Sequence, residues 1–178
     1  MAATPTGQGR TSVRVNVAGS GDSNIETGVP VLDHLLGLLV SHAGFDLALS
    51  VEPGSADAEI DGAARALGEA LEAPLRAAGA RGDGSAALPA DEALAHVALE
   101  ASGRPLLVSN VDLSDARVGG LATDLASRFL DGLAHGAGLT LHVRLIEGSE
   151  TQHVLEAIFK ALGAALAQAC APRRGEAL

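Results

Sequence analysis

A histidine and a glutamate stand three residues apart in the segment SETQHVLEAIFKALG, at His153 and Glu156. On a helix, side chains with this spacing share one face, and an imidazole beside a carboxylate is a common pair of ligands for a divalent metal ion. The same pair also occurs on solvated or salt-bridged helix faces, so the spacing has two interpretations. A metal site needs further ligands, which other elements must bring to this helix.

The start of this helix carries a signal of its own. Ser149 and Gln152 fit the pattern S-x-x-Q, a capping box in which the glutamine side chain reaches back to the first amide of the helix. The pattern predicts a helix from Ser149 to about residue 169 and gives Gln152 a structural role.

Several other segments show regular periodicity. Amphipathic spacing predicts helices at residues 30–42, 57–75 and 121–135, in addition to the one at 149–169. Alternating or β-rich runs predict strands at residues 12–18, 45–52, 94–101, 105–113 and 139–147. The chain is therefore expected to mix helices and strands in an α+β fold.

Two parts of the chain match each other as a helix-strand-helix repeat. Aligning FDLALSVE with LTLHVRLIE places His34 opposite Arg128 without a gap. Aligning Leu67-Gly68 with Leu162-Gly163 places Asp57, Ala58 and Asp61 opposite Gln152, His153 and Glu156, respectively. This agreement predicts a duplicated unit. We expect one domain at residues 10–171, made of repeats at about 10–90 and 91–171, between a disordered tail at 1–9 and a tail at 172–178.

Composition and charge exclude several classes of protein. Hydrophobic residues make up 47% of the chain, which favours a packed core over disorder. The net charge of −10 opposes binding of nucleic acid, and no Trp or Tyr is present to stack on bases. The lone Cys170 cannot form an internal disulfide, and we find neither a signal peptide nor an apolar run of about 18 residues. A cytoplasmic protein without membrane spans is expected.

Four segments together resemble the imidazoleglycerol-phosphate dehydratase family. They are TGVPVLDHLLGLLVSHAGFDL (27–47), DEALAHVALEASGRP (91–105), LTLHVR (139–144) and HVLEAIFKALGAALAQA (153–169). The resemblance implies two duplicated half-domains, with four helices sandwiched between two four-stranded mixed β-sheets. It also implies a metal-dependent hydro-lyase of histidine biosynthesis, and trimers that assemble into a 24-subunit cage with active sites between subunits.

The family binds two manganese ions through an LDH histidine, two HHxxE motifs and a further helix histidine, and this chain departs from that pattern. The resemblance leaves three ligands unchanged: His34, His153 and Glu156. The remaining five ligand positions are occupied by Asp57, Ala58, Asp61, Arg128 and Gln152. At most one manganese ion is expected per site, with possible help from Asp57 or Asp61, and the site could also hold none.

Arg128 has two interpretations, because a guanidinium has no lone pair to offer a metal. Its positive charge could replace a missing ion, or it could form a salt bridge with Asp57 or Asp61. The two aspartates could equally serve as oxygen ligands or as acidic residues that complement the dipole of a helix N-terminus.

The resemblance also implies residues for the substrate and for proton transfer. Those matched to phosphate binding are Arg104, Lys160, Arg81, Arg144 and His142, with Arg81 one residue out of register. Glu92 and His42 are the candidate catalytic residues. A family glutamate thought to act as acid or base is replaced in the pair Thr11-Ser12.

Two functions follow from this pattern. The first is a divergent dehydratase, a homo-oligomer that acts on a small phosphorylated substrate; the loss of five of eight metal ligands leaves its activity open. The alternative is a non-catalytic relative that binds a phosphorylated ligand or assembles with an active sister subunit as a hetero-oligomer.

Overall fold

The computed structural model describes residues 10–113 and 124–174, which form eleven elements. The first half holds β1 (Ser12–Asn16), β2 (Ser23–Glu26), α1 (Pro30–Ala43), β3 (Asp46–Ser50) and α2 (Ala56–Leu75). The second half holds β4 (Asp83–Ala90), β5 (Ala93–Glu100), β6 (Leu106–Ser109), α3 (Leu125–Ala137), β7 (Thr140–Glu147) and α4 (Thr151–Cys170). All four predicted helices are confirmed, although residues 121–123 of the third lie outside the described part of the chain.

The two sheets repeat one topology, which supports the duplication. The first sheet has the order β1-β3-β2 and the second has the order β4-β5-β7-β6. In each half the middle strand pairs antiparallel on one side, as β1–β3 and β5–β7, and parallel on the other, as β2–β3 and β6–β7. The repeat therefore equates β1, β2 and β3 with β5, β6 and β7.

Strand β4 corrects two details of the expected organisation. It has no counterpart among the described residues of the first half, so the first sheet has three strands within residues 10–113 where four were expected. It also pairs with β5, so by sheet membership the halves divide before Asp83 and not near residue 90. The C-terminal tail expected at 172–178 begins with a paired segment, because Pro172 forms a β-bridge with Ala80.

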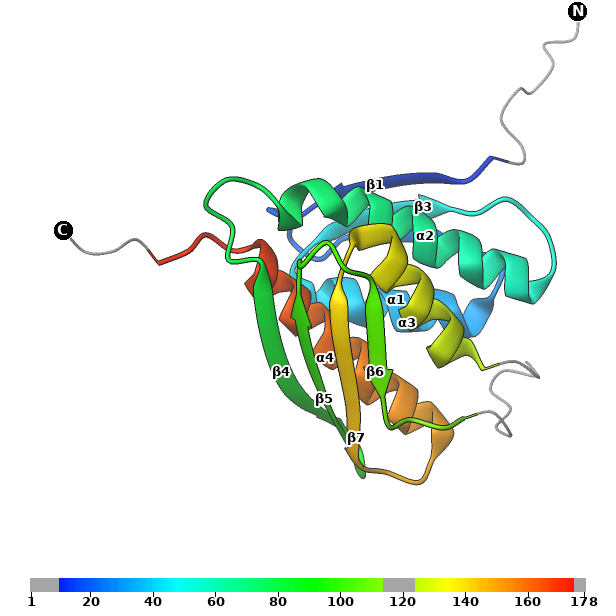
Figure 1. Ribbon diagram of the computed structural model, residues 1–178. Coiled ribbons are helices and arrows are strands. Elements are labelled where there is room, and N and C mark those ends of the chain that lie inside the picture. The colour runs from blue at the N-terminus through cyan, green and yellow to red at the C-terminus, as the bar shows by residue number, and fades with distance from the viewer. Residues whose placement is uncertain (1–9, 114–123, 175–178) are drawn as a thin grey trace, which may run out of the picture.

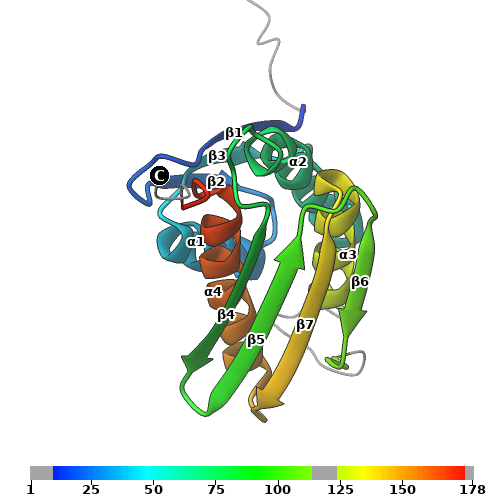
Figure 2. The same cartoon turned by 60° about the vertical axis from the view of Figure 1, so that its left-hand side comes forward.

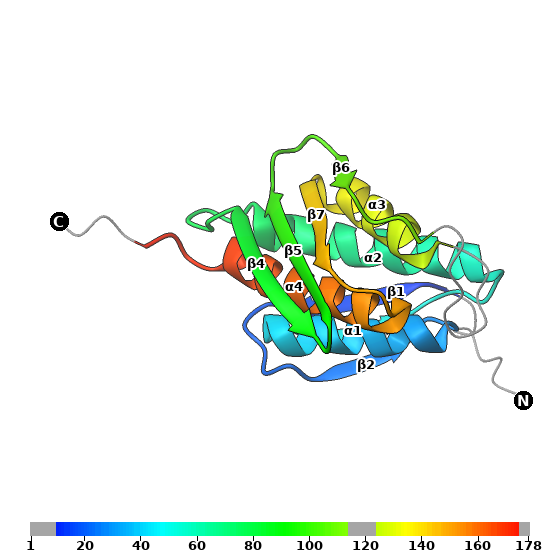
Figure 3. The same ribbon diagram turned by 90° about the horizontal axis from the view of Figure 1, so that it is seen from below.

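The four helices lie between the two sheets (Figures 1 and 2). In the view from below, α1 lies beside α4 and α2 lies beside α3, and the same two pairs are in contact (Figure 3). The helices bury aliphatic side chains from both halves, and the Phe129 and Phe159 rings of α3 and α4 pack with their centroids 5.2 Å apart. Helix packing thus joins one half to the other.

Small residues let the paired helices approach closely. A Cβ added to Gly163 on α4 would lie 2.2 Å from the carbonyl oxygen of Leu39 on α1. Gly68, its counterpart in the repeat, lies against α3, where an added Cβ would be 2.9 Å from the carbonyl oxygen of Leu133. Both contacts are too short for a real side chain, so the duplicated Leu-Gly pair marks the two helix crossings.

Helix α4 is long and apolar enough to cross a membrane by composition alone. It is instead a core helix, since 61% of the relevant window is buried inside the protein. It packs on α1, β4 and β5.

Candidate metal and substrate site

The first turn of α1 is fixed by a buried polar contact. Thr27, which is only 1% exposed, donates its backbone amide and its hydroxyl to Asp33 Oδ1. The Thr27 hydroxyl oxygen also accepts the amide of Val29, just before Pro30 starts the helix. These bonds hold the turn from which the next residue, His34, projects.

His34 meets the first turns of α4 at what we call the α1–α4 half-site, made of His34, Gln152, His153 and Glu156. His34 Nε2 lies 3.1 Å from Glu156 Oε1, and Gln152 Nε2 donates to the same oxygen at 3.1 Å. Burial raises the pKa of Glu156, but the bonds from Gln152 and His34 outweigh it and lower that pKa overall. Glu156 is therefore a carboxylate at neutral pH.

The expected capping box at the start of α4 is wrong. The N-cap is Glu150, whose side chain accepts the amide of Gln152, and Gln152 turns towards Glu156. Glu92 provides the reason, because it accepts the amides of Ser149 and Glu150 at 3.4 and 2.8 Å. The amides that a capping glutamine would satisfy already have a partner.

Glu92 also orients His153. Its Oε2 atom lies 2.6 Å from His153 Nδ1, while His153 Nε2 lies 3.2 Å from Asp91 Oδ2. The Glu150 amide and the His153 bond lower the pKa of Glu92 to about 2, and the bond to Glu92 raises the pKa of His153. A carboxylate on Nδ1 favours the tautomer with its lone pair on Nε2, the atom that a metal would need and that Asp91 contacts in this chain. The resemblance implies a catalytic role for Glu92, whereas its pairing with His153 is visible only in the structure.

Arg128 forms an ion pair at the α2–α3 half-site, which comprises Asp57, Ala58, Asp61 and Arg128. Its Nη1 atom lies 2.8 Å from Asp61 Oδ2, and its Nη2 atom lies 3.4 Å from Asp57 Oδ2. Both aspartates stand in the early turns of α2, which Ser55 caps by accepting the amide of Ala58. The salt bridge expected as one alternative for Arg128 is confirmed.

The two half-sites differ in their fitness for a metal. His34, Glu156 and the Nε2 atom of His153 are suitable donors, but His153 faces Asp91 and Glu92 and not the His34–Glu156 pair. Within residues 10–113 and 124–174, no three His, Cys, Asp or Glu side chains form a group that could hold an ion. The α1–α4 half-site therefore fits part of a ligand set, and the α2–α3 half-site, with a guanidinium in it, does not fit one.

The residues expected to bind phosphate do not gather at one place in a single chain. Lys160 Nζ donates to the carbonyl of Pro89 at 3.2 Å, on the α4 side of the second sheet. Arg104 lies in the turn before β6, where its carbonyl accepts the hydroxyls of Ser102 and Thr140. Arg144 lies opposite His96 in the strand register, on the sheet face turned away from the helices.

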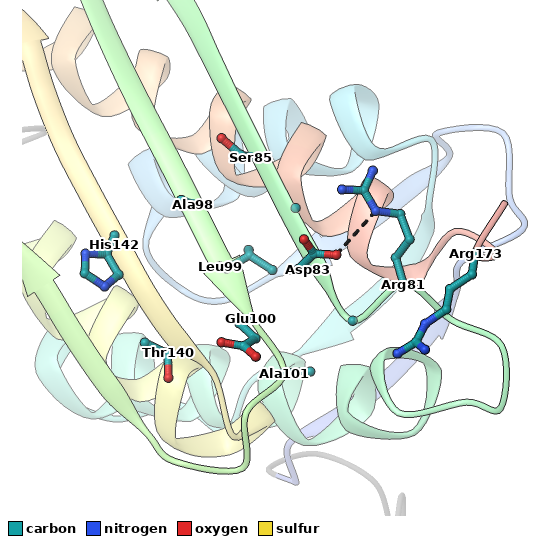
Figure 4. Close-up of a pocket in the computed structure, with 12 residues that line it drawn as sticks. Arg81, Asp83, Ser85, Ala98, Leu99, Glu100, Ala101, Thr140, His142 and Arg173 are labelled. Atoms are coloured by element: carbon teal, nitrogen blue, oxygen red, sulfur yellow. Dashed lines mark hydrogen bonds and ion pairs between the residues drawn. The ribbon is translucent and has the colours of Figure 1, made fainter.

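Arg81 and His142 line one pocket of about 540 Å³ at the end of the second sheet (Figure 4). Arg81 Nε lies 3.4 Å from Asp83 Oδ1, and Arg173 enters the same pocket from the segment after α4. Arg173 is not among the residues expected from the sequence, where its only signal is the basic pair in the segment APRRGEAL.

The candidate catalytic residue His42, and Thr11 from the pair that replaces a family glutamate, both lie away from the half-sites. His42 is in the last turn of α1, where its Nδ1 contacts the carbonyl of Leu38 at 2.9 Å, at the opposite end of the helix from His34. The Thr11 hydroxyl oxygen accepts the amide of Glu52 at 3.0 Å beside the first sheet. Within one chain, neither residue joins the α1–α4 half-site.

The chain is similar to proteins of one family across most of its length. The imidazoleglycerol-phosphate dehydratase family profile matches residues 27–166. The imidazoleglycerol-phosphate dehydratase of Acetivibrio thermocellus is 41% identical over 168 residues, which cover 90% of this chain and 85% of that protein. The same enzyme from Exiguobacterium sp. is 37% identical, with 92% and 86% covered.

Solved structures agree with these relatives. The imidazoleglycerol-phosphate dehydratase of Staphylococcus aureus superimposes with a TM-score of 0.84 at 32% identity, covering 96% of this chain and 97% of that chain. The Pyrococcus furiosus structure gives a TM-score of 0.78 at 30% identity, covering 92% and 90%. The expected family fold is confirmed, apart from the strand count of the first sheet.

Proposed function

Because this chain belongs to the imidazoleglycerol-phosphate dehydratase family, we propose that it dehydrates imidazole glycerol phosphate slowly, in histidine biosynthesis. It does so with one manganese ion per chain in place of two. The observation that carries this proposal is the contrast between the half-sites: His34 meets Glu156 in one, and Arg128 is paired with Asp61 in the other.

His34 and Glu156 would hold the ion, with His153, turned away from Asp91, and ligands from a neighbouring subunit completing the set. Such an ion would supply positive charge that stabilises the anion left when a base removes a carbon-bound hydrogen of the substrate as a proton. Glu92 keeps Nδ1 of His153 protonated, and Gln152 holds the Glu156 carboxylate in place. Loss of a second ion worth roughly 3 kcal/mol in the transition state lowers kcat by about 100-fold.

Substrate binding in this proposal uses the phosphate group. Arg104, Lys160, Arg81, Arg144 and His142 supply the cationic and hydrogen-bonding groups. Because Arg104 and Lys160 lie apart from the pockets that His142 shares with Arg81 and with Arg144, the phosphate site is assembled between copies in a homo-oligomer, and His42 joins the metal ligands of a neighbour. The net charge of −10 and the single Cys170 support a cytoplasmic protein that does not bind nucleic acid.

We propose a trimer as the metal-free assembly, because an ion that bridges subunits would be needed for a larger cage. Light scattering of the chelated protein should give the mass of three chains. A metal-free particle of 24 subunits would contradict this part of the proposal.

The second candidate is a non-catalytic subunit that binds a phosphorylated ligand or completes an active sister chain. The observation that favours it is the Arg128 ion pair, since ligands that act together lose function together. A His34→Ala variant separates the two candidates. The slow dehydratase loses its remaining turnover with this change, whereas a non-catalytic subunit has none to lose.

The test is dehydration of imidazole glycerol phosphate with added manganese. The parent chain is compared with His34→Ala and with a restored variant that carries Asp57→His, Ala58→His, Arg128→His and Gln152→His. We expect turnover in the order restored variant, parent, His34→Ala, with about 100-fold between the first two. His135→Ala, which changes an exposed α3 histidine paired with Asp131 of its own helix, is the control. A parent as fast as the restored variant would overturn the proposal.

A further inference from the structure

The two half-sites occupy equivalent places in the duplicated fold. His34 is the counterpart of Arg128, and Glu156 is the counterpart of Asp61, by the alignment of the repeats. The contacts follow the same rule, since α1 meets α4 through His34–Glu156 and α2 meets α3 through Arg128–Asp61. The Arg128 guanidinium therefore lies where the first half places an imidazole that faces a carboxylate.

The surroundings of Arg128 are acidic. The groove between α2 and α3, with a volume of about 990 Å³, is lined by four carboxylates and two guanidiniums: Asp61, Glu69, Asp124, Asp131, Arg65 and Arg128. Asp124 is the N-cap of α3, and its side chain accepts the amide of Ser127. This bond holds the Asp124 carboxylate in the groove that Arg128 also lines. Asp57 adds a further negative charge through its contact with Arg128. A cation at this position lowers the repulsion among these groups.

We propose that the Arg128 guanidinium is a built-in replacement for a divalent cation at the α2–α3 half-site. This half-site binds no metal, and the junction of α2 with α3 does not depend on one. The proposal is independent of whether the protein dehydrates a substrate, because it concerns the half-site that does not contain His34.

Removal of the guanidinium should therefore create a metal site. In Arg128→His, the new imidazole joins Asp57 and Asp61 to give three donors within one chain, a set that suits manganese. Arg65→Gln is the control, because it removes the same charge from the same groove, adds no imidazole and leaves the Arg128 ion pair intact. Electron paramagnetic resonance of free manganese measures the bound ions in parent and variants at equal protein concentration.

We expect Arg128→His to bind one manganese per chain more than the parent, and Arg65→Gln to match the parent. Because the readout is a difference, it does not depend on how many ions the α1–α4 half-site holds. An equal gain in both variants would overturn the proposal. The proposal would also be overturned if the Asp61→Asn substitution in the parent chain caused the loss of a bound manganese ion.

A second variant keeps the test independent of the folding of Arg128→His. Arg128→Ala leaves Asp57 and Asp61 without their cation, so its Tm should fall by about 1–4 °C in chelator, because an exposed ion pair adds only a little stability. Manganese should then recover more of the Tm in Arg128→Ala than it adds to the parent, because the free carboxylates accept the ion. An equal manganese effect on the two proteins would count against replacement of an ion by Arg128.

Discussion

His34 Nε2 and Glu156 Oε1 lie 3.1 Å apart, although 122 residues separate them in the chain. The contact exists because α1 and α4 cross closely at Gly163 and because Asp33 anchors the first turn of α1. Because this contact joins the two halves of the chain, a change in helix packing far from His34 and Glu156 would alter the distance between them.

The first prediction concerns the carboxylate behind His153. Glu92→Gln should lower the affinity for manganese by about 10–100-fold, because the neutral amide no longer fixes the tautomer of His153. Titration monitored by electron paramagnetic resonance measures the change. Glu69→Gln, on α2 in the other groove, is the control and should bind as the parent does.

The second prediction concerns pH in the metal-free protein. The raised pKa of His153 adds stability below its unfolded value of 6.5, which is lost as pH rises through the folded pKa. Glu92, whose pKa falls from 4.5 to about 2, adds stability above 4.5, which is lost as pH falls towards 2. The stability difference between parent and Glu92→Gln should therefore be largest between pH 4.5 and 6.5, as measured by urea unfolding with chelator. A difference that does not change with pH would contradict the pairing.

The third prediction concerns the crossing of α1 and α4. Gly163→Ala should lower the free energy of unfolding by about 1–3 kcal/mol, because the new methyl group meets the Leu39 carbonyl. Gly37→Ala is the matched control on α1, where an added Cβ meets nothing within 4 Å. It should raise the free energy of unfolding by about 0.5–1 kcal/mol, because alanine loses less entropy in a helix. Denaturant titration distinguishes the two signs.

The fourth prediction concerns the buried Thr27. Thr27→Val keeps the shape but removes the hydroxyl that bonds Asp33, so the free energy of unfolding should fall by about 1–3 kcal/mol. The affinity for manganese should fall as well, since the turn that carries His34 loses an anchor. Unchanged metal binding in a destabilised protein would show that Thr27 serves the fold alone.

The sequence predicted the helices well and the edge strands poorly. The apolar stripe of each helix depends on residues within a few turns, so α1, α2 and α4 begin and end within two residues of their predicted bounds. Strands β2 and β4 were missed, and each lies at the edge of its sheet. Strand β4 packs so closely on α4 that Gly84 has no room for a side chain. A Cβ added there would lie 2.0 Å from the carbonyl oxygen of Ala165. That constraint arises from a distant helix and leaves no local period.

For the site, the sequence alone determined which residue types occupy the duplicated positions, and hence that Arg128 cannot donate to a metal. It also indicated Asp57 and Asp61 as the partners of Arg128 in one of two interpretations, and the ion pair confirms that one. Only the tertiary structure decided that His153 pairs with Glu92 and that Gln152 turns to Glu156. Residue type fixes what a side chain can bind, whereas its actual partner depends on which distant turn the packing of helices and sheets brings within hydrogen-bonding distance.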